Sequence, residues 1–342
     1  MLRGRGITYD TGFLSGGATS GPPVFDADAV RRDLRTIRTE LHCTAVRVTG
    51  GDQDRLELAA TIAAEEGLEV WYSPFTTDLD RDEMLAFLAD TAERAERIRR
   101  GGAEVVVAAG AEASLFVRGF LPGETFYDRL ELFTPSNTEL PAILAAVTGP
   151  LNDFLRAATA TIRERFGGKV TYASLPFENV DWSGFDYLGI DFYPNMVEGH
   201  FPGLDQALHP VRRHGKPIAI TEVGTAPHTG SSANAGHSFL PVEYDGRSTR
   251  PLRLSRELDR NETEQATYLG TLLDVLDARD DIDTVFVQTF ANFHLVTRDD
   301  PQRDLDRASF GLVKVRETPD GIPAWEPKEA FATVAARYAR TR

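Results

Sequence analysis

Eight short apolar runs recur along this chain, and helix-like segments separate most of them. Most of the runs are continuously apolar rather than alternating, which is typical of strands buried on both faces of a parallel sheet. Regular alternation of eight such strands with helices predicts an α/β fold of the (β/α)8 TIM barrel type. The runs are Gly6–Asp10, Ala45–Thr49, Glu69–Phe75, Val105–Ala109, Lys169–Leu175, Tyr187–Tyr193, Ile218–Glu222 and Val285–Phe290.

The segments between the runs space their apolar residues at helical period, and a glycine follows several of them, as expected at helix C-termini. A doubly wound dinucleotide-binding sheet would require Gly-x-Gly-x-x-Gly after the first strand, but Asp-Thr-Gly-Phe stands at 10–13. We therefore expect one barrel domain over residues 1–342. The predicted helices are Asp26–Thr39, Arg55–Glu66, Arg81–Arg100, Leu151–Phe166, Asn261–Leu276 and Pro327–Tyr338.

Charge and composition exclude several classes of partner. The net charge is −15, from 52 acidic and 37 basic residues, and no basic block occurs, so neither nucleic acid nor an anionic membrane surface is expected as a partner. No apolar run approaches the roughly 18 residues of a membrane span. Cys43 is the only cysteine, so no intrachain disulfide can form. The N-terminus shows no apolar signal region, and we expect a cytoplasmic protein, with the oligomeric state open.

The predicted loops are long at one end of the barrel and short at the other. Ser114–Pro141, Thr225–Arg260 and Asn292–Leu312 follow strands 4, 7 and 8, whereas Gly101–Glu104 and Gly167–Lys169 are short glycine turns before strands. In TIM barrels the loops after the strands carry function. The sequence therefore predicts a functional site at the C-terminal ends of the strands.

Polar and aromatic residues gather at these predicted strand ends. Glu112 follows the fourth run and Glu222 ends the seventh. Carboxylates and amides bind sugar hydroxyls, and aromatic rings bind the apolar faces of sugars, so we expect a carbohydrate or glycoside ligand. The further residues predicted to bind it are Asp10, Arg47, Tyr72, Glu178, Trp182, Asp191, Tyr193, Gln288 and Asn292.

Two motifs resemble those of the clan A glycoside hydrolases, a large group of (β/α)8 barrels. Ile-Thr-Glu-Val-Gly at 220–224 is similar to the strand-7 signature, in which Thr/Ser-Glu-x-Gly follows an apolar strand. Asp-Tyr-Leu-Gly-Ile-Asp-Phe-Tyr-Pro at 186–194 is similar to strand 6 of the endo-mannanase-like and galactanase-like branches. The resemblance implies that Glu112 is the acid/base, that Glu222 is the nucleophile and that Tyr193 hydrogen-bonds the nucleophile.

The chain departs from the clan pattern at two positions. The clan places an asparagine before the acid/base, where it bonds the sugar 2-hydroxyl, and this chain has Ala111 there. The tryptophan platform of strand 8 is also missing, and Thr289 and Phe290 stand in that region. These departures leave the substrate class open.

The mechanism implied is retaining hydrolysis of an O-glycosidic bond by double displacement, in which two carboxyl groups lie about 5–5.5 Å apart. Glu222 would attack as the ionised nucleophile, supported by Arg47 and Tyr193. Glu112 would be the acid, with its pKa raised by the charge of Glu222 and by partial burial. Glu178 is a rival acid.

Two alternative functions remain. One is a non-catalytic barrel that binds a carbohydrate or a protein. The other is a different barrel hydrolase or lyase that uses Glu222 and Asp191 in other roles. The seven histidines lack the spacing of a metal site, because His209 and His214 lie five apart around Pro210. We predict no metal and no cofactor.

Overall fold

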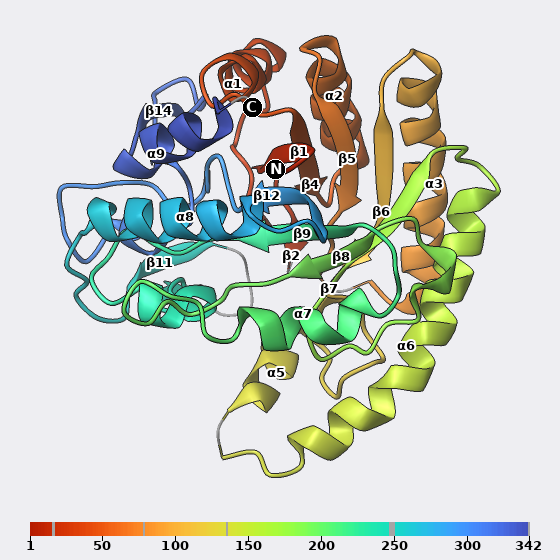
Figure 1. The fold of residues 1–342 in the computed structure, drawn as a ribbon. Coiled ribbons are helices and arrows are strands. Elements are labelled where there is room, and N and C mark those ends of the chain that lie inside the picture. Colours follow the sequence, from red (N-terminus) through yellow and green to blue (C-terminus); the bar gives the residue numbers. More distant parts are fainter. Residues whose placement is uncertain (16–17, 78, 135, 246–249, 341–342) are drawn as a thin grey trace.

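Eight parallel strands form a closed barrel in the computed structural model (Figure 1). The structure describes residues 1–15, 18–77, 79–134, 136–245 and 250–340; residues 135 and 246–249, which fall in two of the predicted loops, lie outside this description. The strands, in their order around the barrel, are β1 (Gly4–Asp10), β4 (Ala45–Gly50), β5 (Glu69–Pro74), β6 (Val105–Ala111), β7 (Lys169–Ser174), β8 (Leu188–Asp191), β9 (Ile218–Val223) and β12 (Ile282–Val287).

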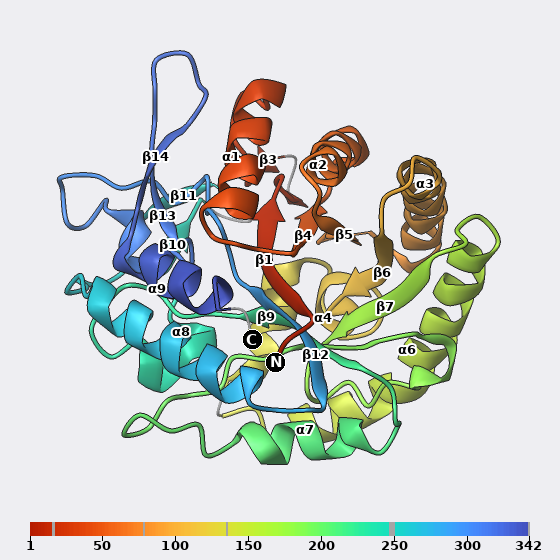
Figure 2. The same ribbon diagram turned by 45° about the horizontal axis from the view of Figure 1, so that its top comes forward.

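Helices surround this barrel, and the predicted (β/α)8 TIM-barrel fold is confirmed. Each predicted apolar run overlaps a barrel strand, and β12 pairs with β1 to close the ring that the helices surround (Figure 2). The hydroxyl of Tyr338 in the last helix donates to the Gly6 carbonyl of β1 at 2.9 Å, so the C-terminal helix ties the two ends together. The outer helices are α1 (Ala27–Thr39), α2 (Gln53–Glu65), α3 (Arg81–Arg100), α6 (Leu140–Arg163), α7 (Leu204–Arg212), α8 (Glu262–Asp277) and α9 (Glu329–Tyr338).

Several helix boundaries differ from the prediction, and the start of α6 differs most. Helix α6 begins at Leu140 rather than Leu151 and continues through Gly149 and Pro150. Glycine and proline usually interrupt a helix, but here the apolar stripe that includes Val147 and Leu151 is buried on both sides of the proline, and this packing sustains the helix. Helix α9 begins at Glu329, because the preceding residues form strand β14.

The interior of the barrel is filled by large side chains near the N-terminal ends of the strands. Ala45, Trp71, Val106, Tyr187, Ala219 and Phe286 form one buried cluster. The Trp71 ring lies 5.0 Å from Tyr187 and 4.9 Å from Phe286 between centroids. A Cβ at Gly6 would lie 2.4 Å from the Phe286 ring, so β1 supplies the space that this ring occupies. The inside of the barrel is therefore a packed core and not a channel.

Replacing Trp71 by alanine should lower the free energy of unfolding by about 3–5 kcal/mol, because the ring fills the barrel and is 1% exposed. Urea denaturation measures this loss. Val275→Ala on the exposed side of α8 is the matched surface control and should change stability by less than about 0.5 kcal/mol. Equal losses in the two variants would contradict the packing described here.

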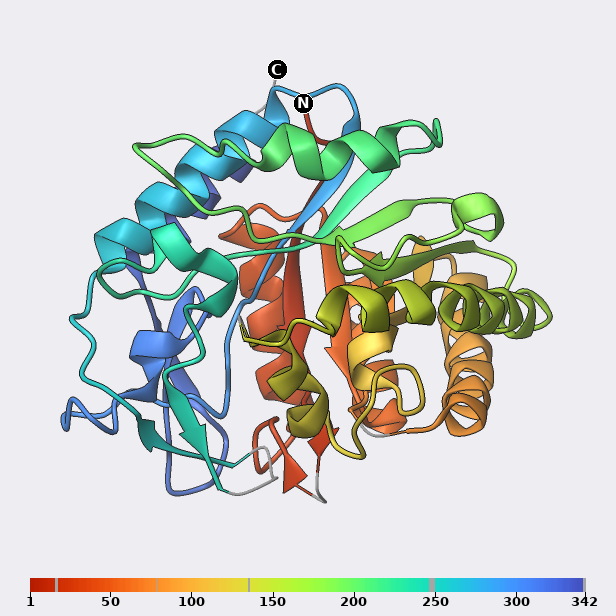
Figure 3. The same ribbon diagram turned by 90° about the horizontal axis from the view of Figure 1, so that it is seen from below.

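The loops after β6, β9 and β12 are long, as predicted, and they contain most of the small elements of the fold, while β2 and β3 follow β1 and η2 follows β7. Figure 3 shows the pairs β2–β3 (red) and β10–β11 (teal) at the end of the molecule opposite the marked termini. Among the described residues, every helix lacks the length or the apolar character that a membrane span requires. The small elements are β2 (Leu14–Ser15), β3 (Ala18–Thr19), α4 (Ala113–Phe116), α5 (Phe126–Leu130), η1 (Glu131–Phe133), η2 (Trp182–Gly184), η3 (Ser232–His237), β10 (Val242–Tyr244), β11 (Pro251–Leu254), η4 (Leu305–Ala308), β13 (Val313–Arg316) and β14 (Ala324–Pro327).

Candidate functional site

The alternation of side chains along the strands carries several predicted site residues into the barrel mouth. Successive side chains of a strand point to opposite faces, so residues two and four beyond the inner cluster face inward again. Arg47 follows Ala45 on β4, and Asp191 follows Tyr187 and Gly189 at the end of β8. Asp10 occupies the same face of β1 as Gly6. These three side chains therefore lie above the packed core.

Glu222 is held by two partners on opposite sides. The Arg47 guanidinium forms an ion pair with Oε1, and the Tyr193 hydroxyl donates to Oε2. The pairing of β8 with β9 shifts by one residue here, so that Glu222, and not Thr221, stands beside Asp191. This irregularity turns the carboxylate toward the mouth. Arg47 is itself fixed, because its Nε donates to the Ser73 hydroxyl at 3.0 Å.

Glu112 lies at a sharp turn between β6 and the short helix α4. Its backbone has φ 46° and ψ 42°, the left-handed conformation, which is uncommon for a residue with a side chain. The turn is secured by Tyr172, whose hydroxyl accepts from the Ala113 N–H at 2.7 Å. Uncommon backbone conformations of this kind are frequent at functional sites.

Glu178, the rival acid, has a different position from the one expected. Its two oxygens accept from the N–H groups of Ser114 and Leu175 at 3.0 and 2.9 Å and from the Tyr172 hydroxyl at 2.9 Å. With these donors in place, Glu178 holds the backbone next to Glu112. It is buried, and the structure gives it a supporting contact to the turn rather than a place in the mouth.

Three carboxyl groups meet at the mouth. Glu112, Asp191 and Glu222 each place one oxygen within 4.8 Å of an oxygen of the other two. Such a group could bind a divalent cation, and it could equally act on one glycosidic bond, since retaining pairs lie about 5–5.5 Å apart. The two predicted catalytic glutamates are therefore neighbours, although they come from strands three positions apart in the barrel.

Burial raises the pKa of several carboxyls in this group. The pKa of Glu112 lies well above its usual range because of burial and of the charges of Asp191 and Glu222. Burial and then the charge of Glu222 raise the pKa of Asp191 to about 8. Burial, opposed by the Gly12 N–H, raises the pKa of Asp10 to about 6. These groups hold their protons more firmly than carboxyls in water do.

Asp191→Asn should stabilise the protein at neutral and alkaline pH. An unfolded aspartate ionises near its usual pKa of 3.8, while Asp191 in the fold keeps its proton up to about 8. The folded state thus binds more protons between these values, and stability falls as pH rises through this window. We expect a gain of about 1–2 kcal/mol for the variant at the upper end of the window. Urea unfolding at both ends of the window measures it. If the unfolding free energies of the wild-type protein and the variant changed equally with pH, the raised pKa of Asp191 would be contradicted.

Tyr72 and Trp182 were predicted to line the mouth, and their placement is corrected by the structure. Tyr72 lies between the inward-facing Trp71 and Ser73, so it points outward, and its hydroxyl approaches the Gln53 side-chain oxygen of α2 at 3.3 Å. Trp182 packs against Phe185 between the strands and the outer helices, with ring centroids 5.6 Å apart. Both rings belong to the core.

The remaining predicted residues occupy supporting or peripheral places. Asp10 accepts from the Gly12 N–H at 2.8 Å. Gln288 continues the inward-facing side of β12, and its side-chain oxygen is buried without a hydrogen-bond partner among the described residues. Asn292 accepts from Ser309 Oγ and from the Phe310 N–H at 3.1 and 3.0 Å, so it anchors the loop after β12.

Sequence reasoning missed two residues that position groups of the candidate site, Ser73 beneath Arg47 and Tyr172 beneath the Glu112 turn. A signal for Ser73 existed, because it is a small polar residue two positions after the inward-facing Trp71. Tyr172 reads only as one more apolar residue of a buried strand.

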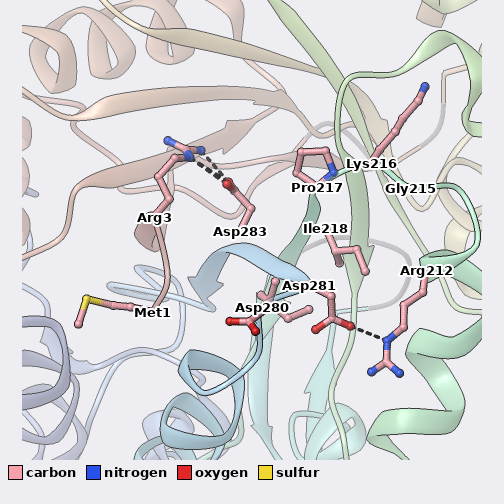
Figure 4. Close-up of a pocket in the computed structure, with 11 residues that line it drawn as sticks. Met1, Arg3, Arg212, Gly215, Lys216, Pro217, Ile218, Asp280, Asp281 and Asp283 are labelled. Carbon is pink, nitrogen blue, oxygen red and sulfur yellow. Dashed lines mark hydrogen bonds and ion pairs between the residues drawn. The ribbon is translucent and has the colours of Figure 1, made fainter. Parts of the chain in front are cut away.

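A separate cavity of about 520 Å³ lies at the other end of the barrel, near the starts of β1, β9 and β12 (Figure 4). Its basic side chains already have protein partners. Arg3 pairs with Asp283 at 2.9 Å, and Lys216 donates to the carbonyls of Trp182, Ser183 and Phe185 at 2.6–3.1 Å. The mouth, where strained and unpaired groups gather, is therefore the candidate site.

Comparisons with known proteins identify the fold. No family model matches the chain, and no curated protein matches it in sequence. Among solved structures, a GH113 β-1,4-mannanase has a TM-score of 0.65 at 16% identity over 99% of this chain and 100% of the other. A GH113 β-mannanase from Alicyclobacillus acidocaldarius has 0.60 at 16% identity, covering 99% and 98%.

A GH2 β-galacturonidase from Eisenbergiella tayi also matches, with a TM-score of 0.57 at 15% identity over 98% of this chain and 51% of that protein. All three are glycoside hydrolases by description. At sequence identities of 15–16%, the similarity shows the fold alone. The chain therefore has the (β/α)8 barrel found in the GH113 β-mannanases, as its resemblance to clan A predicted.

Proposed function

We propose that this protein is a retaining glycosidase that acts on a carbohydrate or glycoside, with Glu222 as nucleophile and Glu112 as acid/base. The observation that carries the proposal is the approach of oxygens of the two glutamates to within 4.8 Å. Inverting enzymes separate their carboxyls by about 6.5–9.5 Å to admit a water, so this spacing favours attack by one carboxylate.

The surroundings of the two glutamates suit different roles. Glu222 accepts from Arg47 and Tyr193, so a cation and a hydroxyl donor hold the oxygens of the proposed nucleophile in place. The raised pKa of Glu112 keeps its proton available for the leaving oxygen. In the first step Glu222 attacks the anomeric carbon while Glu112 protonates the departing oxygen. In the second step Glu112 takes a proton from water, which attacks the same carbon and releases Glu222.

Aromatic contacts between the long loops bear on substrate size. The rings of Tyr127 and Tyr244 lie 6.4 Å apart, and they belong to the loops that follow β6 and β9, the strands that lead to the two glutamates. The ring of Phe75, which follows β5, lies 4.5 Å between centroids from the ring of Phe116 in α4, in the loop after β6. Loops that meet in this way favour short glycosides or chain ends over the interior of a long polymer. Added sugar units should then leave kcat/KM unchanged in a series of oligosaccharides.

The stereochemistry of the first product tests the proposal. A panel of aryl glycosides identifies a substrate, and proton NMR during turnover follows the anomeric signal of the released sugar. Retention of configuration is expected. Inverted product would show that water attacks directly, and it would remove Glu222 from the role of nucleophile.

A further inference from the structure

The mouth of the barrel holds more carboxyl groups than hydrolysis needs. Asp10, Glu112, Asp191 and Glu222 gather there, and among the described residues only Arg47 forms an ion pair with any of them. Double displacement uses two carboxyls, and Arg47 balances the one that must be ionised. Two acids therefore remain without a role in the reaction.

Asp191 is the member of this group whose two carboxyl oxygens are both buried and without a hydrogen-bond partner among the described residues. The residue is 2% exposed. Asp10 accepts from a backbone N–H, and Glu222 accepts from two side chains. A buried carboxyl group without a hydrogen-bond partner is costly, so Asp191 is a group that a polar group on a ligand would satisfy.

Asp191 also lies next to the position of the reacting carbon. One of its oxygens is within 4.8 Å of oxygens of both Glu112 and Glu222, and these two groups flank the anomeric carbon in the proposed reaction. A substituent on the neighbouring ring carbon is therefore within reach of Asp191. The side chain of Ala111, which precedes Glu112, has no hydrogen-bonding group.

We infer that the site takes glycosides of 2-amino-2-deoxy sugars, and that Asp191 binds the protonated amine of the sugar. An ammonium group donates hydrogen bonds and supplies a second positive charge besides Arg47, and charge-assisted hydrogen bonds are roughly twice as strong as neutral ones. The unpaired Nη2 of Arg47 remains for a sugar hydroxyl, an acceptor. This inference rests on the proposed function.

Binding of hydrolysis-resistant methyl 1-thioglycosides tests the inference on the full chain. Isothermal titration calorimetry compares each 2-amino sugar with its 2-hydroxy parent in the gluco, galacto and manno configurations. In at least one configuration, the amino sugar should bind about 10–100 times more tightly. Because the pKa of Asp191 is about 8, binding at neutral pH should also release a proton, which titrations in buffers of different ionisation enthalpy detect.

Two variants test the part that Asp191 plays. Asp191→Asn keeps the shape of the side chain and should abolish both the preference for the amine and the proton release. Asp153→Asn, the same change at an exposed carboxyl of α6, should retain both. Equal affinity for amino and hydroxy sugars overturns the inference, and so does an amine preference that survives Asp191→Asn. Failure of every sugar to bind overturns it as well.

Titration with Mg²⁺ and Ca²⁺ tests whether these carboxyl groups bind a divalent cation instead of an amine. Tight metal binding that Asp191→Asn removes, without any preference for the amine, would overturn the inference in favour of a metal site. Hydrolysis of neutral aryl glycosides by retention, without an amine preference, would leave the proposed function standing. Binding of the amino sugar without hydrolysis of any glycoside would support amine binding by Asp191 and contradict the proposed function.

Discussion

Replacing Glu222 by glutamine should reduce kcat by about four orders of magnitude or more, because the amide cannot attack the anomeric carbon. Glutamine has the shape of glutamate and can still meet Arg47 and Tyr193, so the fold should remain intact. Steady-state rates on a substrate from the aryl-glycoside panel measure the effect, and circular dichroism checks the fold.

The control for this variant is Glu257→Gln, the same change at an exposed position in the same loop after β9. It should retain wild-type activity. If Glu222→Gln retained it too, Glu222 would be a structural partner of Arg47 and the hydrolytic role would belong elsewhere. The rival reading of the site as a binding protein would then gain support.

Replacing Glu112 by alanine should produce losses that depend on the leaving group. General acid–base catalysis contributes about 10²–10⁴-fold, so glycosides with poor leaving groups should lose this much, while activated aryl glycosides lose less in the first step. Their covalent intermediate should then accumulate, because no base activates water. Added azide should restore turnover and yield a glycosyl azide of retained configuration.

Glu178→Gln is the informative comparison for this second variant. Glu178 holds the backbone beside Glu112 through Ser114, so its loss should lower activity with every leaving group alike and azide should have no effect. If the loss of activity depended on the leaving group in Glu178→Gln but not in Glu112→Ala, Glu178 would be the acid/base and Glu112 the supporting residue.

The number and order of the barrel strands could be predicted from the sequence, because strands buried on both faces remain apolar throughout. Because such strands do not alternate between polar and apolar residues, the sequence does not show which side chains face the inside of the barrel. Tyr72 stands between Trp71 and Ser73 in a run without alternation, so nothing in the sequence shows that it faces α2. The position of Glu222 beside Asp191 depends on a register shift that only the folded sheet reveals.

Helix boundaries and supporting contacts were harder to predict for similar reasons. The helix through Pro150 is sustained by tertiary packing, which overrides local preference. Glu178 has the residue type and place of a catalytic acid, and only its three donors identify it as a support. The two glutamates could be singled out as candidates because each stands at the end of an apolar run, and a parallel barrel gathers its strand ends at one face.

Labelling by a mechanism-based covalent glycoside probe, offered in the gluco, galacto and manno configurations, tests the central proposal most directly. Peptide mass spectrometry should find the sugar attached to Glu222 in the wild-type protein, and Glu222→Gln should abolish labelling. Attachment at another carboxylate, or hydrolysis of a glycoside by a protein that no probe labels, would contradict a nucleophile at the end of β9.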